Sequence, residues 1–151
     1  MRPIERRPTP DRLVIGIGNP LRCDDGVGTL LAEEAGGRSV HQLTPELAEE
    51  IAPLQAVLFI DAWLAPAGAG PELRELGLGR GAAAILDAGS HRLEPEQLLA
   101  VCEALYGRRP RGHLLRVPGF VFGHGTALSA GLRASLPLAR GLLRCWRGGH
   151  A

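Results

Sequence analysis

The chain has 151 residues, 45% of them hydrophobic, and a net charge of +1. This length and composition suit one globular domain with its own core, and a charge so near zero argues against binding to nucleic acid or to an anionic membrane. All 17 basic residues are arginine. Because a P-loop needs a lysine on the nucleotide phosphates, the sequence excludes a Walker-type NTPase, and it disfavours a phosphorelay receiver domain, which also relies on a lysine.

The cysteine pattern and the N-terminal sequence bear on the cellular compartment. The chain has three cysteines, Cys23, Cys102 and Cys145, with no CxxC pair and no apolar segment of a secretory signal. No apolar stretch is long enough to cross a bilayer. We therefore expect a reduced, cytoplasmic location without membrane insertion. The Arg- and Pro-rich residues 1–11 are expected to form a flexible tail, and residues 12–147 a single domain.

In the first half of the chain, hydrophobic patterns predict strands that alternate with helices. The apolar run at 13–17 is typical of a buried parallel strand, and residues 26–35 have apolar side chains at helical spacing. A short strand is expected over 39–43. The sequence Thr44-Pro45-Glu46 predicts a second helix, with Thr44 as N-cap, that continues to about Ala52.

The second half continues the alternation. The expected elements are a strand over 56–62, an edge strand over 72–76, a strand or loop over 82–86, a helix from about Pro95, a strand over 112–117 and a C-terminal helix over 128–146. Pro137 is expected to kink or divide that last helix. Together the elements predict an α/β fold, a three-layer sandwich with a mostly parallel central sheet flanked by helices.

The first strand leads directly into a loop with two glycines and two acids, Gly16-Ile17-Gly18-Asn19-Pro20-Leu21-Arg22-Cys23-Asp24-Asp25-Gly26-Val27-Gly28. Gly16 and Gly18 allow another backbone or a ligand to approach closely. Asp24 and Asp25 lie near the carboxyl end of the strand, where open α/β sheets place their binding crevice. Adjacent carboxylates there indicate a site for a cation, a proton or a water molecule. The alternative role is helix capping, which we expect of Asp24.

Two more residues are candidates for the same site. Asp61 ends the strand at 56–62, and the carboxyl ends of Asp61's strand and the first strand should meet at one edge of the sheet. His91 can reach that edge if Gly89-Ser90 turns the chain back across it. Two carboxylates and an imidazole suit Ni, Zn, Fe or Mn and leave positions open for water or substrate. Singly, Asp61 could cap a loop and His91 could be a surface residue.

Three neighbouring residues are weaker candidates. Cys23 is interpreted as a small buried residue rather than a soft ligand or a redox thiol. His124, in the sequence Phe122-Gly123-His124-Gly125-Thr126, is a second-tier candidate for the lining of the cleft. Trp63 fits either a cleft wall or the core.

The pattern Gly16-x-Gly18-Asn19-x-Leu21-x-x-Asp24-Asp25-Gly26-x-Gly28 resembles the N-terminal signature of the hydrogenase maturation proteases. These endopeptidases remove a C-terminal extension from the large subunit of nickel–iron hydrogenases. Three later segments are similar to further motifs of the family and follow the family's order: Phe59-Ile60-Asp61-Ala62, Ser90-His91 followed by Leu98-Leu99, and Gly125-Thr126-Ala127-Leu128-Ser129. The matches span most of residues 12–147.

The resemblance implies a single α/β protease domain with a phosphorylase/hydrolase-like fold, acting as an aspartic-type endopeptidase on a hydrogenase large-subunit precursor. By motif position, the metal-facing and catalytic residues would be Asp25, Asp61 and His91. The family's metal is regarded as nickel carried by the substrate, so no resident organic cofactor is expected, although other divalent metals could occupy the site. We expect a monomer. The residues expected to bind substrate are Gly18, Asn19, Asp24 and His124.

Two departures from the family pattern stand out. The acid pair is Asp-Asp, so the metal-facing carboxylate at Asp25 has a shorter reach than a glutamate would have. Many members carry an Asp-Gly-Gly-type turn after the second strand, where this chain reads His41-Gln42-Leu43-Thr44-Pro45-Glu46. An acid that could assist catalysis is therefore missing there. A divergent relative that binds metal and assists maturation without proteolysis remains an open alternative.

Two other classes share the opening glycine pattern. Peptidyl-tRNA hydrolases also begin with Gly-x-Gly-Asn-Pro, which Gly18-Asn19-Pro20 matches, but here Asp24-Asp25 stand where that family carries a Tyr and an Arg-His-Asn run. A dinucleotide-binding module would need a third glycine where Leu21 stands, and two acids would repel a pyrophosphate. Both are less favoured alternatives.

Overall fold

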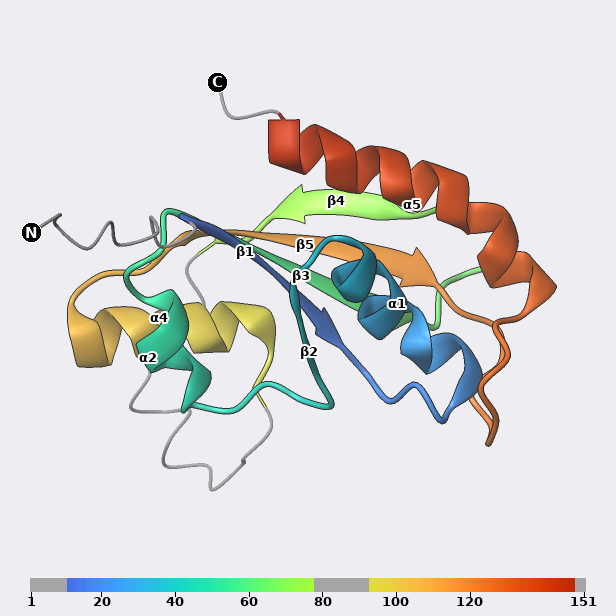
Figure 1. Ribbon diagram of the computed structural model, residues 1–151, viewed down its shortest axis with the longest axis horizontal. Helices are drawn as coiled ribbons and strands as arrows, with labels where there is room; N and C mark the ends of the chain where they lie inside the picture. Colours follow the sequence, from blue (N-terminus) through green and yellow to red (C-terminus); the bar gives the residue numbers. More distant parts are fainter. Residues whose placement is uncertain (1–10, 78–92, 149–151) are drawn as a thin grey trace, which may run out of the picture.

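The computed structural model describes residues 11–77 and 93–148. Its centre is a five-stranded sheet in the order β2-β1-β3-β5-β4 (Figure 1). The central strands are parallel, and β4 pairs antiparallel with β5 at one edge. The strands are β1 (Arg12–Ile17), β2 (Arg38–Val40), β3 (Ala56–Trp63), β4 (Glu72–Glu75) and β5 (Arg111–Pro118).

Helices cover both faces of the sheet, as Figure 1 shows. The core cluster on one face is built with α2 (Leu47–Ile51) and α4 (Pro95–Tyr106). The cluster on the other face is built with α1 (Val27–Glu34) and α5 (Ala130–Gly148). The predicted three-layer α/β sandwich with a mostly parallel sheet is therefore confirmed.

Strand β3 reads as an uninterrupted apolar run because both of its faces are buried. Val57 and Phe59 point into the cluster with α2 and α4, and Leu58 and Ile60 point into the cluster with α1 and α5. Side chains of a strand alternate between faces, so Asp61, two residues after Phe59, belongs to the α2/α4 face. This alternation decides which face of the sheet the Asp61 carboxylate lies on.

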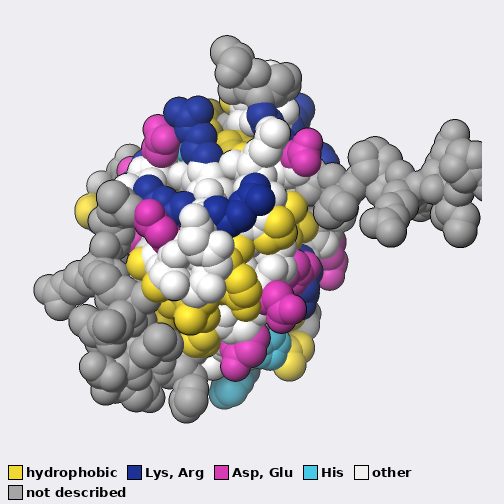
Figure 2. Space-filling model, turned by 90° about the vertical axis from the view of Figure 1, so that its left-hand side faces the viewer, with side chains coloured by type: hydrophobic (Ala, Val, Ile, Leu, Met, Phe, Trp, Pro, Cys, Tyr) yellow, Lys and Arg dark blue, Asp and Glu magenta, His cyan; other side chains and the backbone are white. Residues whose placement is uncertain are grey.

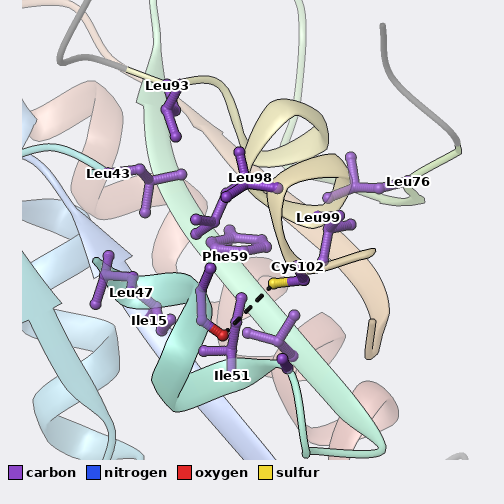
Figure 3. Packing of buried hydrophobic residues seen from close by; sticks show 14 of the residues in the cluster. Ile15, Leu43, Leu47, Ile51, Phe59, Leu76, Leu93, Leu98, Leu99 and Cys102 are labelled. Carbon is purple, nitrogen blue, oxygen red and sulfur yellow. Dashed lines mark hydrogen bonds between the residues drawn. The ribbon is translucent and has the colours of Figure 1, made fainter. Parts of the chain in front are cut away.

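Phe59 lies at the centre of the α2/α4 cluster, and Leu98 and Leu99 of α4 pack beside it (Figure 3). The Cys102 thiol donates a long hydrogen bond of 3.8 Å to the Ala48 carbonyl oxygen, which joins α4 to α2. Burial raises the pKa of Cys102 to about 11, so this thiol stays protonated at neutral pH. Cys102 is therefore a core residue with no thiolate chemistry.

The start of α4 agrees with the prediction from Pro95. Pro95 is at the first helical position, and the backbone N–H of Glu94 donates to Gln97 Oε1 at 2.8 Å. Gly107, with φ of 70°, ends the helix in the left-handed conformation. These local signals determine where α4 begins and ends.

Two predictions near the second strand are wrong in detail. β2 ends at Val40 rather than continuing to Leu43, because β1 itself ends at Ile17 and the last bond joins the Gly18 N–H to the Val40 carbonyl. The second helix begins at Leu47, and Thr44 is not its N-cap. The Leu47 N–H instead donates to the Thr44 carbonyl, so a tight turn precedes the helix.

The C-terminal helix α5 begins at Ala130 rather than Leu128 and continues through Pro137, so Pro137 does not divide it. Its start is fixed by Ser129, whose hydroxyl accepts the Leu132 N–H at 3.1 Å. No helix in the described part of the chain is long and apolar enough to cross a membrane. The predictions for residues 1–10, for 82–86 and for the Gly89-Ser90-His91 turn lie outside the described residues.

Candidate active site at the carboxyl edge of the sheet

The acidic loop after β1 folds back over the carboxyl ends of β1 and β3. It contains the short helix η1 (Cys23–Gly26), which leads directly into α1. Gly16 of β1 pairs in register with Ile60 of β3, so Asp61 lies one residue beyond that pair, beside the end of β1. Asp25 and Asp61 therefore share the carboxyl edge of two adjacent strands, as the sequence predicts.

Asp25 is anchored to the first residues of its own loop. The Asn19 N–H donates to Asp25 Oδ2 at 2.8 Å, and Asn19 Oδ1 accepts the Leu21 N–H at 2.9 Å. Gly18 has a φ of 136°, and a Cβ at this position would lie 2.1 Å from the Asp25 carbonyl oxygen. Only glycine allows this approach. Gly18 and Asn19 thus orient Asp25, which remains half-buried at the edge.

The N-terminus of α1 packs directly on the strand backbone at the same edge. A Cβ added to Gly28 would lie 2.6 Å from the carbonyl oxygens of Ile17 and of Ile60. These atoms belong to the backbone of β1 and β3 and cannot rotate away. The close packing therefore fixes where the loop places Asp25 relative to the end of β3.

We expect Gly28→Ala to destabilise the protein by about 2–3 kcal/mol, because the added methyl group overlaps two strand carbonyls. Urea unfolding followed by circular dichroism measures the loss. Gly70→Ala is the matched control, since a Cβ there meets no atom within 4 Å. Equal stability of the two variants would show that α1 does not need this close approach.

Asp24, next to Asp25, is fully buried and serves a different purpose. Its carboxylate accepts the N–H groups of Phe120 at 2.7 Å and Val121 at 3.0 Å, and both the N–H and the hydroxyl of Ser129 at 2.7 Å. Burial alone would raise the pKa of Asp24, but these hydrogen bonds lower it below its usual value. Asp24 is therefore an ionised carboxylate that holds the segment after β5.

The expectation that Asp24 caps the helix after its own loop is wrong. The N-cap of α1 is Gly26, with no side-chain hydrogen bond, and Asp24 instead binds residues of the segment between β5 and α5. With 0% exposure, its side chain has no surface available for direct contact with a substrate. Cys23 is buried beside it, as expected.

Further backbone bonds join the loops after β1 and β5. The Cys23 N–H donates to the Gly125 carbonyl at 2.8 Å, the Gly125 N–H to the Leu21 carbonyl at 2.9 Å, and the Asp24 N–H to the Val121 carbonyl at 2.9 Å. His124 is exposed within this joined segment. The two loops are therefore bonded to each other beside Asp25. Because His124 belongs to the loop after β5, the fold brings its segment to the candidate site.

On the α2/α4 face, Asp61 has a charged neighbour that the sequence analysis missed. Arg116 of β5 pairs in register with Asp61, and its guanidinium lies 3.8 Å from the centre of the Trp63 ring. Arg116 Nε also donates to Glu72 of β4 at 2.9 Å. The sequence does carry a signal for this residue, since Arg116 interrupts the apolar run Leu114-Leu115-Arg116-Val117. Trp63 is half-buried under this cation and forms part of the surface beside Asp61.

His91, the third predicted ligand, lies outside the described residues. Leu93, two residues later, is anchored by its N–H to the Leu43 carbonyl at 3.2 Å, in the segment that follows β2. Among residues 11–77 and 93–148, no group of three or more His, Cys, Asp or Glu side chains converges as a metal site. The described part of the edge thus supplies two oxygen donors, Asp25 and Asp61.

Comparison with solved structures decides what this architecture is similar to. The protease HybD from Thermococcus kodakarensis, described as a [NiFe] hydrogenase maturation protease, superposes with a TM-score of 0.63 at 20% identity, covering 88% of this chain and 96% of that one. The hydrogenase maturating endopeptidase HybD from E. coli gives 0.64 at 20% identity, covering 92% and 93%. This chain has the hydrogenase maturation protease fold.

A third structure of that fold, the maturation protease HycI from Thermococcus kodakarensis, gives a TM-score of 0.61 at 19% identity over 88% of this chain and 90% of that one. No protein-family model matches the sequence, and no curated protein matches it. The family resemblance drawn from the motifs is thus confirmed at the level of the fold. Both chains are covered nearly end to end, so the maturation protease fold accounts for the whole domain.

Proposed function

We propose that the protein is an endopeptidase that removes the C-terminal extension of a nickel-loaded [NiFe]-hydrogenase large-subunit precursor. The observation that carries the proposal is the pairing of a maturation protease fold with Asp25 and Asp61 at one edge of the sheet. The ordered motifs agree with it. The enzyme would work in the cytoplasm as a monomer, with no resident organic cofactor.

The chemistry follows from the residues at the edge. Water attacks the scissile carbonyl carbon while a carboxylate, Asp25 or Asp61, accepts a proton from that water. The C–N bond then breaks, and a proton passes to the amine of the departing peptide. The products are a new carboxylate at the end of the mature subunit and a free C-terminal peptide.

Nickel enters as part of the substrate. Two carboxylate oxygens and the imidazole of His91 would complete the coordination of a nickel ion already held by the thiolates of the precursor. That ion would also polarise the scissile carbonyl as a Lewis acid. A precursor without nickel would bind less well and would not be cut, which makes cleavage a check on metal loading.

The test is incubation of the purified protein with the nickel-loaded precursor, followed by mass spectrometry of both products. We expect one C-terminal peptide and one shortened subunit from the wild type, and neither from His91→Ala. If the wild type binds the loaded precursor and releases no peptide, the alternative of a metal-binding maturation factor replaces this proposal. Cleavage of a peptidyl-tRNA ester instead would identify a different hydrolase.

A further inference from the structure

Four exposed apolar side chains surround the candidate site. Leu21, Leu64, Phe120 and Val121 are 62%, 76%, 57% and 47% exposed. Leu21 follows β1, Leu64 follows β3 directly, and the other two follow β5, so they mark the carboxyl edge of the three central strands. We call these four residues the apolar rim. Large apolar side chains gathered at one end of a molecule are typical of a protein interaction surface.

The rim is one surface because its loops are bonded to each other. The Gly119 N–H donates to the Trp63 carbonyl at 2.8 Å, which places Leu64 next to the segment of Phe120. Asp24 holds Phe120 and Val121 through their N–H groups, and the Gly125 N–H holds the Leu21 carbonyl. A surface fixed in this way loses little conformational entropy when a partner binds.

An apolar groove of about 260 Å³ opens beside Leu21, between the loop after β1, helix α1 and the segment before α5. Its lining includes Leu21, Cys23, Leu30, Leu128 and Glu33. Within the described part of the chain, the Glu33 side chain has no hydrogen-bond or ion-pair partner. The groove is mainly apolar, although Thr29 and Thr126 also line it, and it carries one unpaired negative charge, which suits an apolar segment that ends in a basic residue.

The opposite end of the molecule also has exposed apolar side chains, such as Leu105 and Tyr106, but it lies away from Asp25 and Asp61. Figure 2 views that end, where apolar side chains form a patch across the middle of the described surface and basic and acidic side chains lie around it. Arginines there are already paired, as in Arg111 Nε with Glu75 Oε1 at 2.9 Å. Exposed ion pairs of this kind are usual on a solvated face. The apolar rim borders the edge that holds Asp25 and Asp61, and this position makes it the better candidate for docking a substrate protein.

We propose that the apolar rim and its groove are the docking surface for the folded body of the large-subunit precursor, with a basic residue of the precursor against Glu33. This rests on the proposed function, because the rim borders the edge where the tail would be cut. Docking there would hold the precursor while its C-terminal tail crosses Asp25 and Asp61. The folded precursor, rather than its free tail, is the occupant, since Leu64, Phe120 and Val121 lie outside the lining of the groove.

The experiment measures precursor binding and cleavage with Leu21→Ser and with the double variant Phe120→Ser/Val121→Ser. We expect the Kd and KM for the folded precursor to rise at least about tenfold in each, with kcat little changed. Leu105→Ser is the matched control, because Leu105 is 58% exposed on α4 at the opposite end. Glu33→Gln should weaken binding at low salt about threefold and Glu49→Gln should not.

Unchanged Kd and KM in both rim variants, with cleavage by the wild type intact, would overturn the docking surface and leave the proposed function standing. A wild type that neither binds nor cuts the precursor would overturn both. If a synthetic tail peptide is cut as efficiently as the folded precursor, the folded body makes no contribution, and the rim is again rejected. Unfolding curves of each variant exclude loss of structure as the cause.

Discussion

Asp24→Asn will destabilise the protein by about 2–4 kcal/mol, because a buried carboxylate that accepts four hydrogen bonds is replaced by an amide that also brings donors. Urea unfolding at pH 7 measures this loss. Ser129→Ala removes one of the four bonds to Asp24 and also the hydroxyl that accepts the Leu132 N–H at the start of α5, so it should cost about 2 kcal/mol. Asp25→Asn is the matched control, since Asp25 is half-buried and accepts the Asn19 N–H.

The difference in unfolding free energy between the wild type and Asp24→Asn depends on pH. Because the pKa of Asp24 is lowered in the folded protein, its ionised form contributes stability that is complete above the pKa of the unfolded chain, about 4. That contribution is lost as the pH falls through the lower pKa of the folded state. We therefore expect the gap in unfolding free energy between wild type and Asp24→Asn to be constant from pH 7 to 5 and to narrow below pH 4. A gap that stays constant to pH 2 would show that Asp24 is not held as a carboxylate.

Asp25→Asn and Asp61→Asn will each lower kcat/KM for the nickel-loaded precursor by about 10²–10⁴-fold, because an amide cannot act as the base for water and is a poorer ligand than a carboxylate for the substrate's nickel. The fold should persist, since both side chains lie at the edge rather than in the core. Single-turnover cleavage followed by mass spectrometry measures the rate, and unfolding curves confirm the fold.

Glu49→Gln is the control for these two variants, as it removes an exposed carboxylate on α2 far from the edge. If Asp25→Asn and Asp61→Asn both cleave as fast as Glu49→Gln, the two carboxylates have no part in the reaction. If only one of them is slow, that residue is needed for the reaction, and the other contributes to neither binding nor catalysis. The double variant would then be no slower than the single one.

The layers of the fold could be predicted because local patterns agreed with the tertiary environment. Strand β3 is apolar on both faces, which is the pattern of a central parallel strand, and its predicted range of 56–62 agrees with Ala56–Trp63. The helix from Pro95 was equally well marked by its capping residues. Where a long-range contact decides the outcome, the prediction failed. Leu43 is buried, but it pairs with Leu93 rather than with β1.

Within the site, the position of Asp25 and Asp61 at one edge followed from the topology of a parallel sheet. The role of Asp24 did not, because its partners Phe120, Val121 and Ser129 are about a hundred residues away in sequence. An acid at the start of a helix predicts a local cap, and nothing in the neighbouring sequence distinguishes a cap from a long-range acceptor. Arg116 was missed for the same reason, since its stacking on Trp63 joins two strands.

The most direct test of the account is cleavage of a hydrogenase large-subunit precursor from the same source in two forms, one loaded with nickel and one free of nickel. Intact-mass spectrometry follows both reactions. We expect loss of a C-terminal peptide from the loaded form, no loss from the nickel-free form, and no loss from either form with Asp25→Asn. Equal cleavage of both forms would contradict nickel-dependent recognition. No cleavage of a verified, loaded precursor would contradict the proposed endopeptidase.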